Sequence, residues 1–575
     1  MDIFTLSEKK FSASDLLPPT LIDESHNGEG PMNASVGSAS ATVRALVRCA
    51  ALAASVLAAA VLIVASFPNP APAGQGTTLV VAASFIIRSI DPGRTVETTS
   101  NMLNHATYDS LVTFEGEDLR TPKPSLATEW KISEDGKTYT FKLRPNVKFS
   151  GGNPLTSTDF KWSFERVKNL KSNPAFYLNP VQEILIPDPL TLVLKLNAPN
   201  PALLAILASP SLGAVDSKLV AEKGGVSGPD AKDRDKAESF LNNQSAGTGP
   251  FILSSYVPEQ EVVLVRNPNH WRPAPAIDRI VIRNITEPAT QKLQIQRGDV
   301  DIATALGQDQ AATLKGMPNV SVRSSLAAVT FYVLMNNNPE VGQAFANPKV
   351  QEAVRYALDY DGIMSIAGAD ASRLAGVIPI GFPGALDPKT AFRTDREKSK
   401  ALLKEAGLGE IKGQITYGSD QVIWGVPMAV LAQKIQADLA AVGIQISLNG
   451  LPRAAALQLY RDAKNQVGVW SWAADFPDQS NFLVYMPGRT VGKRAGWPED
   501  ASPAAKELAM LASKAESELD DAKRAAQMQR VDKRVMEIGP YAPLFQPAVP
   551  VAFRSNVKGV TFHSVWALDF YAISK

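Results

Sequence analysis

Apolar residues recur along this chain with two different periods. Residues 77–83 (TTLVVAA) form a short apolar run, as expected of a buried strand, whereas residues 138–144 (TYTFKLR) alternate apolar and polar positions, as in a half-buried strand. Residues 156–167 (TSTDFKWSFERV) change to helical spacing, and Thr156 and Asp159 match a capping box at the start. This segment predicts a helix whose aromatic stripe belongs to a core.

The second half of the chain predicts a regular alternation of helices and strands. Asn347 followed by Pro348 is a favourable helix start, and residues 396–407 form a second helix with a terminal glycine. A third helix, around residues 431–442, leads into the strand 444–450 (IQISLNG). This alternation predicts an α/β lobe.

Length and composition narrow the protein class. A chain of 575 residues is too long for one ordinary core, so two or three lobes are expected. The formal net charge is +1, and no long basic run occurs, which argues against nucleic acid as a partner. The single cysteine, Cys49, rules out an internal disulfide and a cysteine-based metal site.

The N-terminal region predicts export. An uncharged apolar run at 50–67 follows Arg44 and Arg48 and is succeeded by prolines and the sequence APAG. This pattern is typical of a secretory signal peptide cleaved after Ala73. An uncleaved membrane anchor is the alternative, because the run is near the minimum length that spans a bilayer.

Two further expectations concern this leader. Met32 lies just inside a stretch without acidic residues, which suggests that translation starts there. Cys49 precedes the apolar core, so it cannot serve as a lipoprotein acylation site. The mature protein is therefore expected to be exported and soluble, and not a lipoprotein.

No catalytic or metal-binding pattern stands out. None of the four histidines (His26, His105, His270 and His563) has a partner at metal-ligand spacing, so each is interpreted as a surface or packing residue. The sequence also lacks a serine-centred elbow, a phosphate-binding loop and a dinucleotide-binding glycine pattern. We therefore expect no enzyme, no cofactor and no metal site.

One carboxylate raises a question. Residues 470–482 read WSWAADFPDQSNF, and Asp475 lies between small and aromatic neighbours. Burying a charge there is costly unless a positive group pairs with it. Either Asp475 caps a local turn and the tryptophans are core residues, or it waits for a cationic ligand.

Several segments together resemble one family. Residues 138–167 (TYTFKLRPNVKFSGGNPLTSTDFKWSFERV), 247–271 (GTGPFILSSYVPEQEVVLVRNPNHW), 347–363 (NPKVQEAVRYALDYDGI) and 397–408 (EKSKALLKEAGL) resemble, in order, the hallmark segments of family 5 extracellular solute-binding proteins. These are the periplasmic receptors of dipeptide, oligopeptide and nickel ABC importers. The resemblance covers nearly all of the predicted mature chain.

The resemblance implies an α/β fold of two lobes joined by two hinge crossings. Lobe I would span 74–335, with an extra subdomain at about 115–205, and lobe II would span 336–540. Residues 541–575 would return to lobe I. The first crossing would be FYVLMNNNP, with 336–338 as a hinge, and the second would lie near GPYAPLFQ.

The resemblance also implies a ligand site. In peptide receptors of this family, a Trp-x-x-Asp segment carries the aspartate that pairs with the ligand's ammonium, and here Trp472 and Asp475 match it. Small residues beside Asp475 would let a peptide backbone approach. Two arginines are candidates for the ligand carboxylate, and the segment after the first strand would face the cleft from lobe I. The expected ligand-binding residues are Asp475, Trp472, Ala474, Trp470, Arg461, Arg373, Phe85 and Ile87.

The implied function is that of a monomeric periplasmic binding protein that delivers peptides to an ABC permease and its ATPase. Some oligopeptide receptors have an arginine three residues before the tryptophan, where this chain has Val469, which leaves room for other amine-bearing solutes. The alternatives are a receptor for an opine, an oligosaccharide or a metal chelate, and a secreted hydrolase.

Overall fold

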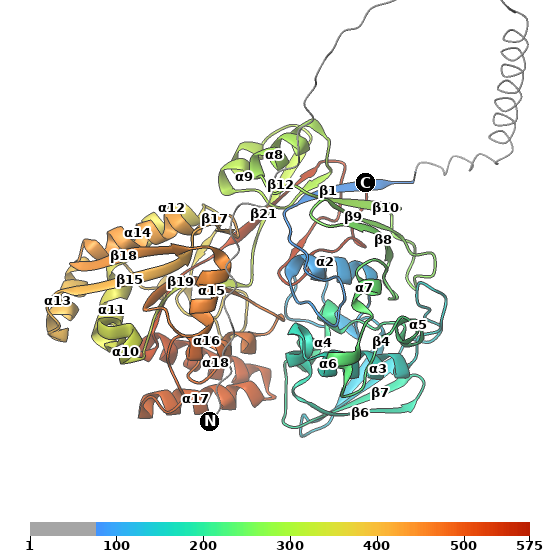
Figure 1. The fold of residues 1–575 in the computed structure, drawn as a ribbon, viewed down its shortest axis with the longest axis horizontal. Helices are drawn as coiled ribbons and strands as arrows, with labels where there is room; N and C mark the ends of the chain where they lie inside the picture. Colours follow the sequence, from blue (N-terminus) through green and yellow to red (C-terminus); the bar gives the residue numbers. More distant parts are fainter. Residues whose placement is uncertain (1–75) are drawn as a thin grey trace, which may run out of the picture. The chain divides into compact units, whose positions relative to one another are not determined.

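The computed structural model describes residues 76–575 of the chain. The predicted signal peptide (1–73), the expected start at Met32, and the residues Cys49 and His26 lie outside the described residues. The described part forms two bodies, which we call lobe I and lobe II, connected by strands (Figure 1). No helix within this part combines the length and the apolar character needed to span a membrane.

Lobe I is built on a seven-stranded mixed sheet. Alternate residues of its central strand enter apolar clusters on opposite faces, Leu79 and Val81 on one and Ala82 on the other, which explains the uninterrupted apolar run in the sequence. The central strand pairs in parallel with both of its neighbours. In sheet order the strands are β12 (Val320–Leu326), β21 (Ala548–Arg554), β11 (Ile302–Ala303), β1 (Thr78–Ala83), β10 (Arg279–Asn284), β9 (Glu261–Arg266) and β8 (Phe251–Val257).

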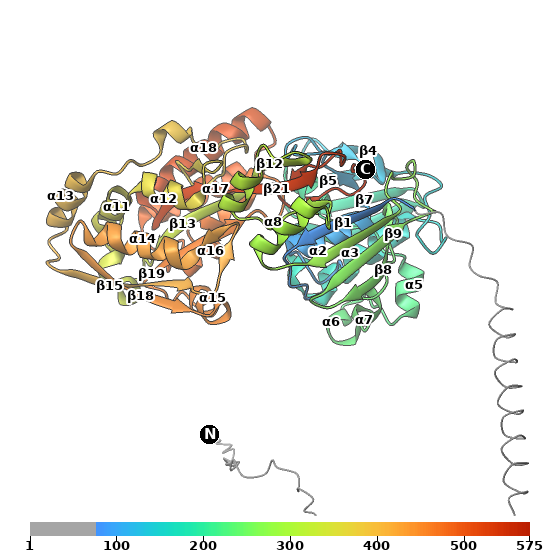
Figure 2. The same ribbon diagram turned by 90° about the horizontal axis from the view of Figure 1, so that it is seen from above.

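Lobe II is built on a six-stranded sheet that is covered on both faces (Figure 2). In the strand Val329–Met335, the side chains of Phe331, Val333 and Met335 pack on one face of the sheet, in a cluster with the helices at 348–357, 360–367 and 428–440. Tyr332 and Leu334 enter the cluster on the other face. All seven residues of this strand are buried. In sheet order the strands are β14 (Ser372–Arg373), β20 (Tyr541–Gln546), β13 (Val329–Met335), β19 (Val467–Ala473), β15 (Ile411–Gly418) and β18 (Ile444–Leu451).

Within lobe I, a separate four-stranded antiparallel sheet forms a subdomain inside the range 115–205. Helix α3 (Ser157–Leu170) packs on it, and the predicted capping box of Thr156 and Asp159 is present at its start. Phe160 and Phe164 are fully buried there, as the aromatic stripe predicted. In sheet order the strands are β4 (Ala127–Ile132), β5 (Thr138–Leu143), β7 (Thr191–Leu196) and β6 (Val181–Asp188).

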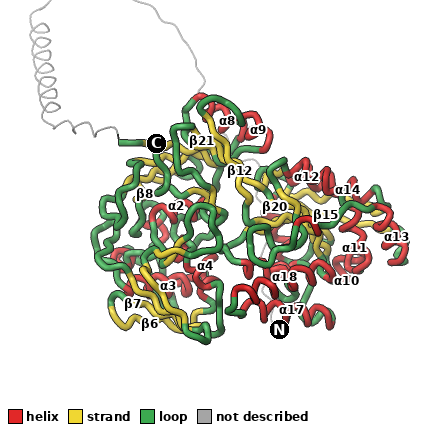
Figure 3. The backbone as a smooth tube through the Cα atoms, turned by 180° about the vertical axis from the view of Figure 1, so that it is seen from behind, coloured by secondary structure: helices red, strands yellow, loops and turns green. Residues whose placement is uncertain are grey.

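The remaining elements surround these sheets (Figure 3). Three two-stranded ribbons are β2 (Val112–Thr113) with β3 (Lys123–Pro124), β16 (Val422–Ile423) with β17 (Val426–Pro427), and β22 (Phe562–His563) with β23 (Ala567–Leu568). The helices of lobe I besides α3 are α2 (Thr98–Thr107), η1 (Asn173–Leu178), α4 (Leu203–Leu207), η2 (Pro210–Leu212), α5 (Ser217–Glu222), α6 (Ala231–Arg234), α7 (Glu238–Leu241), α8 (Pro288–Arg297) and α9 (Gln308–Leu314).

The helices of lobe II begin and end close to the positions that the sequence predicted. Asn347 caps α11, and Gly407 ends α13 in the left-handed conformation. The lobe II helices are α10 (Pro339–Gly342), η3 (Gln343–Ala346), α11 (Pro348–Ala357), α12 (Tyr360–Ala367), η4 (Pro388–Thr390), α13 (Arg396–Ala406), α14 (Met428–Ala440), α15 (Arg453–Arg461), η5 (Gln479–Tyr485), α16 (Thr490–Arg494), α17 (Pro503–Ser517) and α18 (Asp521–Ile538).

The two crossings between the lobes differ from the expected ones. Strand β13, expected to end lobe I, and strand β20, expected to begin the return, pair with each other inside the lobe II sheet. The chain therefore crosses at Ala327 and Ala328, between β12 and β13, and at Pro547, between β20 and β21. By sheet membership lobe II spans 329–546 rather than 336–540.

The expected hinge at 336–338 lies at the far end of β13, away from lobe I. Asn336 is fully buried, and its side-chain amide donates hydrogen bonds to the carbonyls of Ala463 (2.8 Å) and Asn465 (3.0 Å). An asparagine run suggests a flexible turn in sequence, but here the side-chain amide of Asn336 binds backbone carbonyls of lobe II.

A buried ion network joins three segments of lobe I. The guanidinium of Arg166, on α3, donates two hydrogen bonds to Asp91 (2.8 and 2.6 Å) and two to Asp235 (2.8 and 2.9 Å). Arg94 donates to Asp235 as well, at 3.0 Å. Asp235 lies between the short helices α6 and α7, so this polar region of the sequence is anchored to the subdomain helix.

Removing the central cation of this network is expected to destabilise the protein. Arg166→Ala leaves two buried carboxylates without their bidentate partner, which costs roughly 3–5 kcal/mol. The matched control is Arg234→Ala, because Arg234 and its partner Asp230 have side chains that are 71% and 49% exposed. The control is expected to cost under about 1 kcal/mol. Chemical denaturation measures both values, and equal small losses would contradict the central role of Arg166.

Candidate functional site

A pocket of about 530 Å³ lies between the two lobes, and Asp475 lines it. Its lobe II wall includes Trp472, Asp475 and Arg494, which come from the end of β19, the following turn and the end of α16. Val96 and Phe176 belong to the lobe I wall. A pocket of this size accommodates a small organic solute or a short peptide.

The end of strand β19 places Asp475 at the boundary of the lobes. The N–H group of Ala474 donates to the carbonyl of Ala328 (2.9 Å), which lies at the first crossing. The main-chain carbonyl of Asp475 accepts a hydrogen bond from the hydroxyl of Tyr177 (2.7 Å), a residue of the lobe I subdomain. Asp475 therefore follows the carboxyl end of a central strand, where α/β proteins commonly bind ligands.

The Asp475 carboxylate is held by an amide and not by a cation. The side-chain amide of Asn481 donates to it at 3.4 Å, and the indole N–H of Trp472 donates to Asn481 at 3.1 Å. Asp475 forms no ion pair within residues 76–575. Burial raises the pKa of its carboxyl to about 6, against the lowering effects of Asn481 and Arg494. A cation that enters this pocket would stabilise the ionised carboxylate.

The neighbouring Asp478 is already neutralised. Its carboxylate accepts two hydrogen bonds from the guanidinium of Arg524 (2.8 and 2.6 Å) and also caps η5 through the N–H group of Ser480 (2.8 Å). This bidentate pair fixes the turn after Asp475, so the two aspartates of the segment have different roles.

Arg494 provides a positive group in the same pocket. Its guanidinium carbon lies 4.8 Å from the ring centroid of Tyr460 and 5.7 Å from that of Trp472, a cation–π arrangement. Tyr460 is held in turn by stacking on Trp470 (4.3 Å) and by a hydrogen bond with the Tyr332 hydroxyl (2.6 Å). Among the described residues Arg494 has no carboxylate partner, so the pocket presents a carboxylate and a guanidinium that the chain leaves unpaired.

Two of the eight residues expected from the sequence line this pocket, namely Trp472 and Asp475. Trp470 is 8% exposed and packs on Tyr460, and Ala474 is buried in the same apolar cluster. Trp470 and Trp472 are two residues apart and therefore lie on the same face of β19. Trp470 is further from the end of the strand, where the ring of Tyr460 covers it.

Four expected residues lie elsewhere. Arg461 is exposed at the end of α15, and Arg373 donates to the carbonyl of Phe392 and lies over the ring of Tyr360. Phe85 is 4% exposed within the lobe I core, and Ile87 packs against that core.

The lobe I wall and Arg494 were missed by the sequence analysis. Asn173 and Phe176 belong to η1, which follows the subdomain helix, and Val96 precedes α2. No local pattern links these residues to the Trp-x-x-Asp segment, since the tertiary fold alone brings them together. Asn481, in contrast, lies within the stretch 470–482, so its closeness to Asp475 in the sequence could have indicated that the two side chains interact.

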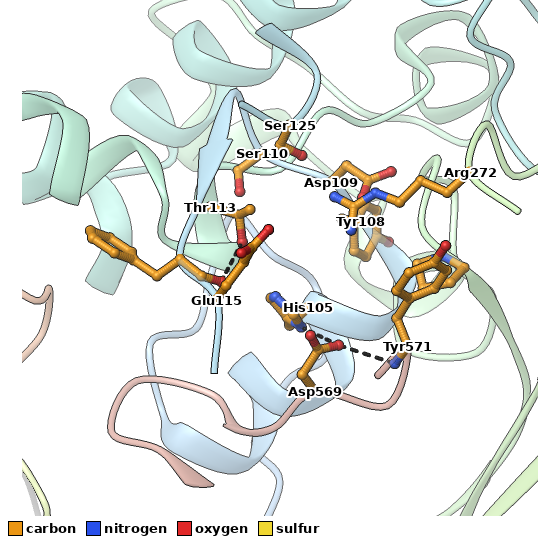
Figure 4. A pocket seen from close by; sticks show the side chains of 12 residues that line it. His105, Tyr108, Asp109, Ser110, Thr113, Glu115, Ser125, Arg272, Asp569 and Tyr571 are labelled. Atoms are coloured by element: carbon orange, nitrogen blue, oxygen red, sulfur yellow. Dashed lines mark hydrogen bonds and ion pairs between the residues drawn. The ribbon is translucent and has the colours of Figure 1, made fainter. Parts of the chain in front are cut away.

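A second, smaller pocket lies inside lobe I (Figure 4). His105, Asp569 and Arg272 converge on it from α2, the C-terminal segment and the loop after β9. Its volume of about 40 Å³ is much smaller than that of the pocket between the lobes. His105 stacks on Trp566 (4.4 Å), and His563 stacks on the same ring (3.5 Å), which is consistent with packing histidines.

Comparisons with known proteins agree with this architecture. Residues 121–493 match the family model described as bacterial extracellular solute-binding proteins, family 5 (middle part). The chain is 28% identical over 511 residues to a probable D,D-dipeptide-binding periplasmic protein of Escherichia coli K12, covering 88% of this chain and 95% of the relative. It is also 28% identical over 542 residues to di/tripeptide-binding protein 2 of Pseudomonas aeruginosa UCBPP-PA14, covering 90% and 98%.

A solved structure shares the fold. The periplasmic binding protein of Helicobacter pylori in complex with the peptide STSA superposes with a TM-score of 0.72 and 24% identity, covering 87% of this chain and 98% of that chain. The likeness confirms the two-lobe α/β fold that the sequence predicted.

The unpaired carboxylate is expected to lower the stability of the ligand-free protein. The raised pKa of Asp475, about 6 against 3.8, means that the folded state loses stability as pH rises from about 4 to 6. Asp475→Asn removes this charge, so the variant is expected to match wild type near pH 3.5. Above pH 6 it should be more stable than wild type, by at most about 3 kcal/mol. Thermal unfolding at both pH values measures the difference, and a pH-independent gap would contradict it.

Proposed function

The chain belongs to the bacterial extracellular solute-binding proteins of family 5, and we propose that it captures a short peptide between its two lobes for an ABC importer. The observation that carries this proposal is the unpaired Asp475 carboxylate in the pocket between the lobes. A peptide supplies the ammonium group that this carboxylate lacks. The relatives named as a probable D,D-dipeptide-binding protein and a di/tripeptide-binding protein support a ligand of this class.

The second unpaired group extends the proposal to both ends of the ligand. When the ammonium of the peptide pairs with Asp475, the free carboxylate at its other end pairs with Arg494. The rings of Tyr460 and Trp472 hold the Arg494 guanidinium in place. A ligand that carries one positive and one negative end neutralises both groups at once. The pocket volume of about 530 Å³ favours a small zwitterion over a long peptide.

The remaining parts of the function follow from this role. The sequence has no phosphate-binding loop, so a partner ATPase supplies the energy of transport and a membrane permease receives the ligand. We further propose that residues 1–73 direct export and are removed, and that the mature chain acts as a periplasmic monomer. Binding and release of solute, with no chemical step, is the proposed activity.

Other solutes that carry both an amine and a carboxylate are alternative ligands for the same two charged groups of the pocket. An opine would use the same two groups, whereas an oligosaccharide has no charge for either of them. Calorimetry with a dipeptide, an opine and an oligosaccharide distinguishes these classes. Heat with the oligosaccharide alone would overturn the peptide proposal.

Asp475→Ala is expected to weaken binding of a free dipeptide by roughly two to three and a half orders of magnitude. The reason is that removal of one partner of a buried ion pair costs about 3–5 kcal/mol. The N-acetylated form of the same peptide lacks the cation, so it should bind wild type weakly and lose little on mutation. Calorimetry measures all four combinations. Equal losses for both peptides would mean that Asp475 shapes the pocket without binding the amine.

Arg494→Gln is expected to weaken binding of the same free dipeptide by roughly one to two orders of magnitude, because the substitution removes a charged hydrogen-bonding partner of the peptide carboxylate. A C-terminally amidated peptide should bind wild type and the variant about equally. Arg461→Gln is the matched control, since Arg461 lies at the exposed end of α15, and its affinity should equal that of wild type. A loss in the control and none in Arg494→Gln would reassign the carboxylate partner.

A further inference from the structure

The segment that carries Asp475 also contacts the subdomain of lobe I. The ring of Phe476 packs against the subdomain's apolar cluster and meets the ring of Tyr177 edge to face, with centroids 6.3 Å apart. The hydroxyl of Tyr177 donates to the main-chain carbonyl of Asp475 at 2.7 Å. One apolar and one polar contact therefore join the lobes directly beside the carboxylate.

The subdomain presents Tyr177 from a fixed position. Helix α3 ends at Leu170, and Lys171, with φ of 53°, turns the chain into η1. Tyr177 is 1% exposed, and the preceding residue of η1, Phe176, lines the ligand pocket. The same short helix thus supplies a pocket wall and the contact with Asp475.

Both contacts exist only while the lobes touch. If the lobes part, the Phe476 ring leaves an apolar cluster for water, which costs free energy in proportion to the exposed area. The carbonyl of Asp475 also exchanges its protein donor for water. The two contacts therefore favour the closed arrangement, and they do so through the residue proposed to bind the ligand's ammonium.

We propose that Tyr177 and Phe476 form a latch that couples recognition of the ligand's ammonium to closure of the lobes. This inference rests on the proposed function, since it requires a ligand held by Asp475. The hydrogen bond from Tyr177 aligns the main chain of Asp475, and the packing of Phe476 keeps water from its carboxylate. Ligand and latch stabilise the same state, so each strengthens the other.

Loss of the latch is expected mainly to speed dissociation of the ligand. Tyr177→Phe removes the hydrogen bond and keeps the ring, so a free dipeptide should bind roughly 2–10-fold more weakly. Phe476→Ala removes the aromatic contact and should weaken binding roughly tenfold or more. Stopped-flow measurement should show faster dissociation, with association rates within roughly threefold of wild type.

A matched control separates the latch from general damage to the subdomain. The hydroxyl of Tyr139 donates to the carbonyl of Asn200 at 2.8 Å, and both residues lie in the subdomain. Tyr139→Phe therefore removes a similar hydrogen bond and leaves the contacts of Tyr177 and Phe476 in place, so its dissociation rate should equal that of wild type. Thermal unfolding of the ligand-free variants confirms that each protein is folded.

Combining variants tests the coupling itself. If closure and recognition are one event, Asp475→Ala should cost less affinity in the Phe476→Ala background than in wild type. Small-angle scattering at saturating dipeptide should also show a less compact average for Phe476→Ala than for wild type.

The outcomes for the latch and for the proposed function are distinct. If wild type binds the dipeptide, Asp475→Ala weakens it, and both latch variants dissociate at the wild-type rate, the latch is wrong and the function stands. If Tyr139→Phe speeds dissociation as much as Tyr177→Phe, the effect is structural and the latch is also wrong. If wild type binds no peptide, the proposed function fails, and this inference fails with it.

Discussion

The position of the subdomain helix depends on one buried guanidinium. Arg166 lies between Asp91 and Asp235, so it ties α3 to the loop after the first strand and to the polar region before β8. Because η1 follows α3 after a single turn, the same ion network sets where Phe176 and Tyr177 face lobe II. A charge cluster outside the ligand pocket thus determines the geometry of the pocket's lobe I wall.

In lobe II, two neighbouring aspartates beside the pocket differ in whether a cation pairs with them. Asp478 is fully paired with Arg524 and caps η5, which gives a rigid turn. Asp475, three residues earlier, is left with one long amide contact, and its pKa is raised by burial. A rigid frame around an unsatisfied group is the arrangement expected where a ligand, rather than the fold, completes the charge balance.

The sequence predicted the fold better than the site. Local periodicity and caps located α3, α11 and α13 because these signals lie within each element. Each predicted crossing was one strand away from the observed one, since a mostly apolar strand such as β13 has the same sequence pattern in either lobe. Asp475 was singled out by an unusual local context, and its proposed role stays a prediction. Arg494 and the η1 residues could not be found, because their proximity arises only from tertiary packing.

The two crossings have a mechanical consequence. They lie side by side: the N–H group of Ala327 donates to the carbonyl of Pro547 (3.0 Å), and the Gln546 amide donates to the carbonyl of Ala327 (2.9 Å). On either side the same two stretches of chain pair as β12 with β21 and as β13 with β20. The connection is thus one antiparallel ribbon that runs through both sheets. Such a ribbon bends across its flat face, but sliding of its strands would break the register of both sheets. The ribbon therefore allows the lobes to swing or twist relative to each other but resists a slide of one lobe along the other, so that closure keeps the alignment of the facing side chains along the strands.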